Sequence, residues 1–102
     1  MVPTQKSEKR KPAGKSLVRK VRFEFSAPEA REVHLVGDFN HWDTQANLMV
    51  KDRKGIWKAT LPLQPGRFEY RFFVDGNWRN DPSSSGFVPN QFGSENCVRI
   101  VE

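Results

Sequence analysis

Two tryptophans in this sequence follow short polar turns, and their types and spacing could do chemistry. Trp42 ends the stretch VGDFNHW, and Trp78 follows the turn DGN. A flat aromatic ring beside amide and basic side chains has what a sugar-binding site needs. A pyranose presents an apolar face of C–H groups for stacking, surrounded by hydroxyls that need donors and acceptors. Turn tryptophans can also plug the end of a β-sandwich, so the residues alone leave both interpretations open.

Four titratable residues are candidates for catalysis, and each has a simpler explanation. His34 falls in a predicted strand, on the face opposite its apolar neighbours, which predicts a histidine that is solvated or lies on the sheet surface. His41 has no serine or cysteine beside it in a nucleophile motif. Asp75 and Asp81 could form the acid and base pair of a glycosidase, but both occupy turn contexts in which aspartate usually bonds to the backbone. We therefore predict no catalytic residues and no enzymatic activity.

Cofactor and metal chemistry find no support in the sequence. No glycine-rich loop follows a strand and opens a helix, as a phosphate-binding loop would. The single cysteine, Cys97, cannot form an intramolecular disulfide, and no Cys/His spacing resembles a zinc site. Neither a signal peptide nor an apolar stretch of bilayer-spanning length is present. We expect no cofactor, no metal and no membrane partner, and a soluble cytoplasmic protein.

The positive charge of the chain is concentrated at its N-terminus. The formal net charge is +5, but residues 1–22 carry eight basic side chains and one acidic, whereas residues 23–102 carry nine basic and eleven acidic. Residues 1–16 contain almost no large apolar side chain and cannot offset the entropy of ordering. We predict a flexible, disordered basic leader over residues 1–16 and a single domain over residues 17–102.

Alternation of apolar and polar residues recurs along the domain and indicates β-strands. In VRFEF, Val21, Phe23 and Phe25 face one side, and Trp57 alternates with polar residues in a way that places it in the core. The segments DRKG and DGN are typical of hairpin turns, and no window has helical periodicity. The pattern predicts an all-β, antiparallel, immunoglobulin-like sandwich, without the Cys…Trp…Cys arrangement of antibody domains. The predicted strands are 18–26, 32–37, 48–52, 55–63, 67–74, a short one near residue 78, and 96–101.

Three spaced segments carry a family resemblance. They are VHLVGDFNHWD, GIWKATLPLQPGRFEYRFFVDGNWRNDP and NQFGSENCVRIV, in that order. Together they resemble the starch- and glycogen-binding modules of the isoamylase N-terminal type, carbohydrate-binding module family 48. Within that family they are similar to the glycogen-binding domain of the AMP-activated protein kinase beta subunit. The resemblance covers residues 18–102 and implies a sandwich that binds α-1,4-linked glucans such as glycogen, starch and maltooligosaccharides, without catalysis.

The resemblance also implies a binding site on one surface. The family's two sugar-stacking tryptophans fall on Trp42 and Trp78, its basic contact falls on Arg71, and its asparagine before the last strand falls on Asn96. Arg71 stands where the kinase domain has lysine, and its planar guanidinium offers a fork of donors that lysine lacks. Alternation along the strand agrees with this role, because Arg71 points away from the predicted core.

A late loop adds two further implied contacts. The family's apolar residue that pushes against the glucan falls on Phe92, and a neighbouring hydroxyl falls on Ser94. Phe92 replaces a leucine and could add a third stacking surface or fill the loop.

Two other partner classes remain open at this stage. Family members often act beside a catalytic domain or within a regulatory subunit, so a protein-interaction module is the alternative function. The basic leader could bind nucleic acid with a steep salt dependence, but we expect it to be solvated, with no specific nucleic-acid partner.

Overall fold

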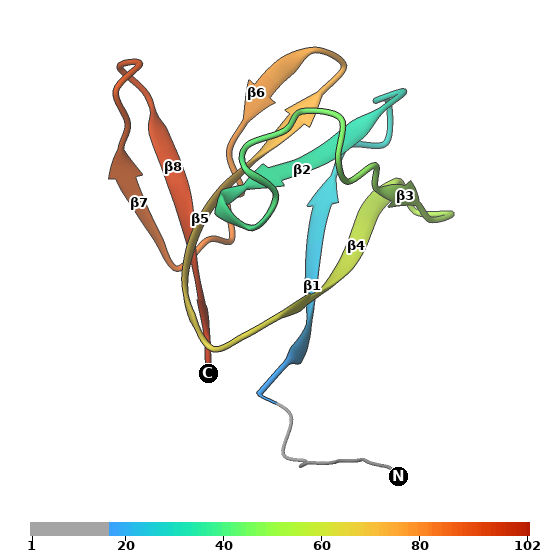
Figure 1. Ribbon diagram of the computed structural model, residues 1–102. Helices are drawn as coiled ribbons and strands as arrows, with labels where there is room; N and C mark the ends of the chain where they lie inside the picture. The colour runs from blue at the N-terminus through green and yellow to red at the C-terminus, as the bar shows by residue number, and fades with distance from the viewer. Residues whose placement is uncertain (1–16) are drawn as a thin grey trace, which may run out of the picture.

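The computed structural model describes residues 17–102, which form two antiparallel β-sheets (Figure 1). The smaller sheet has the order β1-β4-β3, and the larger has the order β2-β5-β8-β7, with β6 pairing to β5. The all-β antiparallel sandwich is therefore confirmed, while the predicted leader, residues 1–16, lies outside the described residues. The strands are β1 (Arg19–Ser26), β2 (Val33–Gly37), β3 (Val50–Lys51), β4 (Ile56–Leu63), β5 (Gly66–Val74), β6 (Asn77–Arg79), β7 (Gly86–Pro89) and β8 (Glu95–Val101).

The core lies between the sheets and is built from the residues that alternate inward. In β1 the buried positions are Val21, Phe23 and Phe25, and the residues between them are exposed. Phe23 meets Tyr70 of β5 edge to face at 5.0 Å between ring centroids. Such pairs add specific geometry to the large apolar area that aromatic rings bury. Trp57 of β4 is buried in this core, as its alternation predicts, and its indole N–H donates to the Ala27 carbonyl at 2.9 Å.

The structure adds two elements that the sequence pattern did not predict. β7 is a strand of four residues, GFVP. It was not predicted because it ends in proline and shows no clear alternation. A single 3-10 turn, η1 (Asp38–Asn40), follows β2. The predicted strand 48–52 shortens to β3, and the segment before it instead joins the outer edge of β2, where Met49 N–H donates to the Val33 carbonyl at 2.8 Å.

Of the two alternatives predicted for His34, a solvated histidine or one on the sheet surface, the solvated one was wrong. His34 does lie opposite the inward-facing residues of β2, but it is 5% exposed. An isolated bridge between His34 and Leu48 shows the reason, since the chain after η1 returns along the edge of β2. Within residues 17–102 neither ring nitrogen has a hydrogen-bond partner, although Nε2 lies 3.6 Å from a carboxylate oxygen of Glu32.

The two turn aspartates bond to the backbone, as predicted. Asp75 accepts hydrogen bonds from the N–H groups of Arg31 and Glu32. Asp81 accepts one from the N–H of Ser83 and is buried.

Within residues 17–102, no three or more His, Cys, Asp and Glu side chains gather in a way that could hold a metal ion. No helix in the same part of the chain is long and apolar enough to cross a membrane.

Candidate functional site

The two turn tryptophans meet on the outer face of the larger sheet. The ring centroids of Trp42 and Trp78 are 6.4 Å apart, with the planes inclined at 58°. Trp78 also packs against Phe73, its partner in the β5–β6 register, with centroids 4.8 Å apart. Trp78 remains 40% exposed although it has aromatic neighbours on two sides. The three rings therefore form an angled platform open to solvent, and Trp42 does not plug the end of the sandwich.

Local backbone geometry presents Trp42 on this face. Asn40 closes the turn after β2: its side-chain oxygen accepts the Gly37 N–H at 3.1 Å, and its amide donates to the Leu35 carbonyl at 2.9 Å. His41 and Trp42 follow in the left-handed region, with φ of 58° and 59°. Two consecutive non-glycine residues in this region are costly for the backbone and persist only where the surroundings enforce them. The bond from Trp42 N–H to the Gly37 carbonyl, at 3.0 Å, is one of those constraints.

Asp38 fixes the Trp42 ring itself. One carboxylate oxygen accepts the indole N–H of Trp42 at 3.0 Å, and the other accepts the backbone N–H of Glu69 in β5 at 2.7 Å. Hydrogen bonds to a charged acceptor are stronger than those between neutral groups. Asp38 therefore ties the Trp42 ring to β5 of the larger sheet.

If Trp42 stacks on a glucan, as the family resemblance implies, we expect Asp38→Ala to weaken that binding without unfolding the domain. A hydrogen bond to a charged group contributes about 1.5 to 3 kcal/mol, but only the part spent on orienting the ring affects ligand binding. Affinity for maltoheptaose, measured by titration calorimetry, should fall by roughly three- to tenfold, about 0.7 to 1.4 kcal/mol. Asp43→Ala is the matched control, because Asp43 in the same loop bonds to the Gln45 N–H and to no ring. Equal affinities for the two variants would contradict the role given to Asp38.

Arg71 supplies the charged edge of the platform. Its guanidinium carbon lies 5.5 Å from the Trp78 ring centroid, and its Nε donates to the Asn80 side-chain oxygen at 2.6 Å. Within residues 17–102 its two Nη groups have no hydrogen-bond partner. A guanidinium held this way stacks on the indole and still presents N–H donors to a hydroxylated ligand.

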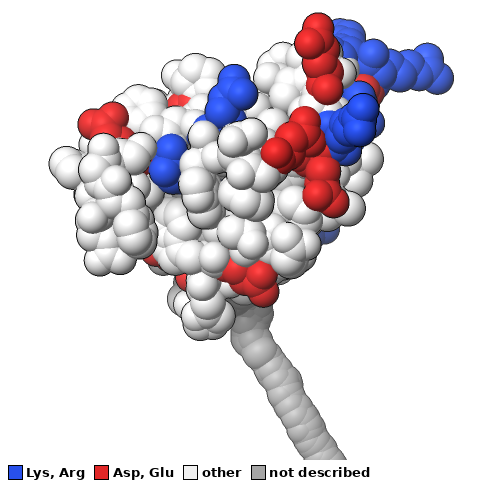
Figure 2. All heavy atoms as spheres, turned by 90° about the horizontal axis from the view of Figure 1, so that it is seen from above, with Lys and Arg blue, Asp and Glu red and all other residues white. Residues whose placement is uncertain are grey.

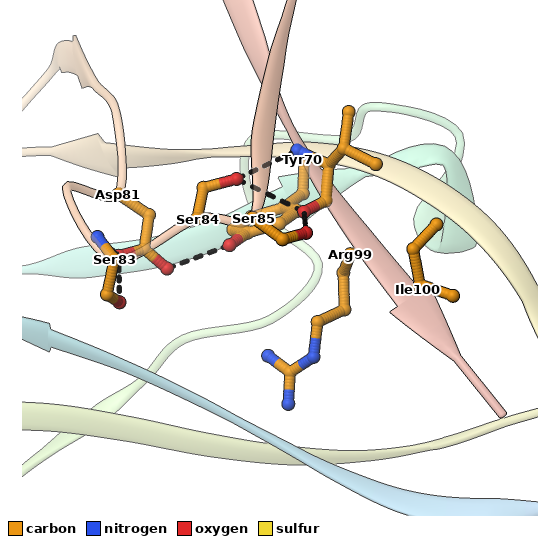
Figure 3. A pocket seen from close by; sticks show the side chains of 8 residues that line it. Tyr70, Asp81, Ser83, Ser84, Ser85, Arg99 and Ile100 are labelled. Atoms are coloured by element: carbon orange, nitrogen blue, oxygen red, sulfur yellow. Dashed lines mark hydrogen bonds between the residues drawn. The ribbon is translucent and has the colours of Figure 1, made fainter.

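The loop 80–85 positions Asn80 for that bond. Figure 3 shows a pocket beside this loop, lined by Tyr70, Asp81, Ser84 and their neighbours. Polar side chains that line it make hydrogen bonds within the domain: Tyr70 donates to Asp81 at 2.8 Å, and Ser84 Oγ donates to the Gly86 carbonyl at 2.7 Å. Burial, followed by the Asp81 carboxylate, raises the pKa of Tyr70 and keeps it a donor. Together with the bond from the Val98 N–H to Ser84 Oγ at 3.1 Å, these contacts anchor the loop to β5 and β8.

The three remaining predicted residues gather around the β7–β8 hairpin. Asn96 donates its side-chain N–H to Glu69 at 3.0 Å and accepts a hydrogen bond from the Asn90 amide at 3.0 Å. Phe92, at the hairpin tip, is 82% exposed, and Ser94 follows it, also exposed. Asn96 and Glu69 lie on the same outer face as Arg71, as alternation along β5 and β8 requires. Glu69 joins the two clusters, because its backbone bonds to Asp38 and its side chain bonds to Asn96.

The ionisation of Glu69 is favoured by these contacts. The hydrogen bond from Asn96, followed by the ion pair with Arg67 at 3.0 Å, lowers the pKa of Glu69 against the opposing effect of partial burial. A lowered folded-state pKa contributes stability above the pKa of the unfolded chain, and this contribution disappears as the pH falls through the folded value.

The stability difference between wild type and Glu69→Gln is therefore expected to depend on pH. At neutral pH the wild type should have the larger free energy of unfolding. The difference should shrink as the pH falls below the usual range of a glutamate, because the charged form is then lost in both states. Urea unfolding at a series of pH values measures it. A difference that stays constant down to pH ~3, below the usual pKa of glutamate, would contradict a stabilising charge at Glu69.

Charge is unevenly distributed over the one face of the molecule that Figure 2 draws. Seen from above, most of the visible surface is uncharged, and acidic and basic side chains gather mainly toward one side (Figure 2). Residues 17–102 carry twelve basic and eleven acidic side chains, which nearly cancel. A nearly neutral domain with an aromatic platform suits a neutral hydroxylated ligand better than a polyanion.

Sequence reasoning missed the residues that hold the site in shape. Each of them contacts the side chain of a predicted site residue. A weak signal existed for the polar ones, since aspartate and asparagine in turns usually bond to nearby groups. For Phe73 the signal was alternation along the strand, which places it on the same outer face as Arg71. These residues are Asp38, Glu69, Phe73, Asn80 and Asn90.

Comparison with known proteins finds one matching family and several relatives. Residues 19–102 match the family described as the glycogen recognition site of AMP-activated protein kinase. Protein FLOURY ENDOSPERM 6, chloroplastic, of Oryza sativa subsp. japonica is 45% identical over 67 residues, covering 66% of this chain and 12% of that protein. The 5'-AMP-activated protein kinase subunit beta-1 of Rattus norvegicus is 39% identical over 72 residues, covering 71% and 25%.

A third relative is an enzyme. The 1,4-alpha-glucan-branching enzyme of Emericella nidulans is 55% identical over 40 residues, covering 39% of this chain and 6% of the enzyme. The chain thus spans a quarter or less of the length of these three relatives. The family match, in contrast, covers nearly all the described residues and includes both tryptophan turns. This chain belongs to the family of the glycogen recognition site of AMP-activated protein kinase.

Proposed function

We propose that this protein binds α-1,4-linked glucan chains on the outer face of its larger sheet and catalyses no reaction on them. The observation that carries the proposal is the platform of Trp42 and Trp78, two indoles 6.4 Å apart and inclined at 58°. Stacked sugars of a straight, flat chain would meet coplanar rings better. An inclined pair suits a chain that curves, as α-1,4-linked glucans do.

The polar groups around the platform would bind the hydroxyl rim of the sugars. Among residues 17–102, no group bonds to the Nη donors of Arg71 beside Trp78, and Asn96 retains one N–H and one lone pair beyond its two side-chain bonds. Phe92 would contact the apolar side of the chain from the hairpin tip, with Ser94 adding a hydroxyl. These groups orient a ligand and supply hydrogen bonds.

The absence of catalysis is supported by the roles of the carboxylates near the site. Asp38 accepts the Trp42 indole and a backbone N–H, and Glu69 is held by Asn96 and Arg67. Glycosidases need one carboxylic acid with a raised pKa beside a second carboxylate, whereas the pKa of Glu69 is lowered. The family membership of the chain points the same way.

Retention on insoluble glucan tests this function. We expect the protein to be retained on amylose resin, released by free maltoheptaose, and not retained on cellulose, whose β-1,4 chains are straight. A chain lacking residues 1–16 should behave identically, because the proposed site lies wholly within residues 17–102. Passage through the amylose column would contradict the proposal and favour a protein-interaction module. We also propose that this protein acts beside a catalytic or regulatory protein.

A further inference from the structure

The tip of the β7–β8 hairpin is held by one side chain. The Asn90 side-chain oxygen accepts the backbone N–H of Phe92 at 2.9 Å and that of Ser94 at 3.2 Å. The backbone N–H of Asn90 donates to the Ser94 carbonyl at 2.9 Å, and Gly93 makes the turn with φ of 80°. The Phe92 ring, 82% exposed, has no core to hold it in place. Its position is therefore set by the backbone that Asn90 organises.

The same Asn90 amide also reaches the sheet face. Its N–H group donates to the Asn96 side-chain oxygen at 3.0 Å, and Asn96 in turn donates to Glu69 at 3.0 Å. An amide that accepts on one side and donates on the other cannot flip without losing both bonds. The orientation of the Asn96 amide is thus determined from both ends.

We propose that Asn90 is a positioning residue of the glucan site, which fixes the orientation of the Asn96 amide and holds Phe92 outward for the ligand. This inference rests on the proposed function. Ordering the tip and the amide before binding lowers the entropic cost of binding, because side chains that are already held in place need not be immobilised by the ligand. An asparagine that only closed the turn would bond to the N–H groups of Phe92 and Ser94 and would not bond to Asn96.

Two substitutions at position 90 separate its two roles. Asn90→Ala removes every side-chain bond. Asn90→Asp keeps oxygens that accept the Phe92 and Ser94 N–H groups but loses the donor to Asn96. Gln91→Ala is the matched control, since Gln91 is exposed at the same tip and its side chain has no hydrogen bond within the described residues.

Titration calorimetry with maltoheptaose should give a graded result. We expect Asn90→Ala to weaken binding by about three- to twentyfold, Asn90→Asp to weaken it less, and Gln91→Ala to match wild type. In double-mutant cycles, Asn90→Ala should be non-additive with both Phe92→Ala and Asn96→Ala, whereas Asn90→Asp should be non-additive with Asn96→Ala only. Amide hydrogen exchange at Phe92 and Ser94 should speed up in Asn90→Ala and remain near wild type in Asn90→Asp.

The outcomes distinguish this proposal from the function beneath it. Wild-type affinity in a folded Asn90→Ala, or losses that simply add to those of Phe92→Ala and Asn96→Ala, would overturn the positioning role while glucan binding stood. Failure of the wild type itself to bind maltoheptaose would overturn the proposed function and this role together. If Asn90→Ala proved unfolded by circular dichroism, the cycle with Asn90→Asp and Asn96→Ala would still decide.

Discussion

Trp78→Ala is expected to cost this protein most of its affinity for maltoheptaose while the fold persists. Trp78 stacks on Phe73 and carries the Arg71 guanidinium, so its removal takes away one platform and the support of the basic group. By analogy with bases stacked on aromatic side chains, the loss is about 1 to 3 kcal/mol, or roughly fivefold to a hundredfold in the dissociation constant. Titration calorimetry beside a thermal unfolding curve measures both properties.

Phe87→Ala is the matched control for this substitution. Phe87 is exposed to a similar extent, 44% against 40% for Trp78, but it pairs with Cys97 and lies on the opposite face of the larger sheet. We expect this variant to bind as the wild type does. Wild-type affinity in Trp78→Ala, or an equal loss in Phe87→Ala, would show that the ligand lies elsewhere.

Gly37→Ala is expected to destabilise the domain strongly. A Cβ at this position would lie 2.5 Å from the Glu69 carbonyl oxygen and 2.8 Å from the Tyr70 Cβ, both in the neighbouring strand. Because these atoms belong to a paired strand, the sheet itself would have to shift. Overpacking of this kind costs about 1 to 3 kcal/mol, which for a domain of this size lowers the melting temperature by roughly 5 to 20 °C.

Gly86→Ala provides the comparison for that prediction. Gly86 is also a strand glycine of the larger sheet, but a Cβ there would meet only the Val98 Cβ, at 3.9 Å, an ordinary contact. Its melting temperature should stay within a few degrees of wild type. If the two alanine variants have the same melting temperature, the close approach of β2 and β5 does not explain why glycine occupies position 37.

The strands were predictable because their patterns are long and periodic. β1, β4 and β5 alternate over eight or nine residues, and the register between β1 and β4 pairs Phe25 with Trp57 as inward-facing neighbours. Alternation did not predict the short elements. β7 has too few residues for a period to appear, and the burial of His34 depends on a segment that returns from thirteen or more residues further along the chain.

The site was predictable in its exposed groups and not in its supports. Trp42 and Trp78 stood out as aromatic residues in polar turns, and the family resemblance supplied Arg71 and Asn96. No spacing in the sequence brings Asp38 to the Trp42 indole and to β5 at once, because that contact exists only after β2 and β5 pair. Whether the six predicted residues contact a glucan stays a prediction until a ligand is bound.

The cellular setting also stays a prediction. The sequence favoured a cytoplasmic protein, whereas the rice relative is chloroplastic by name. Glucan binding by the platform does not depend on which compartment is correct. The buried thiol of Cys97, whose pKa burial raises, is poorly suited to oxidation in either.

The central claim is that ligand stacks on the indoles of Trp42 and Trp78. The three indole N–H resonances of this protein, followed by NMR during titration with maltoheptaose, test it most directly. Trp57 is an internal reference, since its indole is buried and bonded to the Ala27 carbonyl. We predict saturable shifts of the Trp42 and Trp78 signals with the Trp57 signal nearly unmoved. Saturation of binding with the Trp42 and Trp78 signals unmoved would contradict the claim.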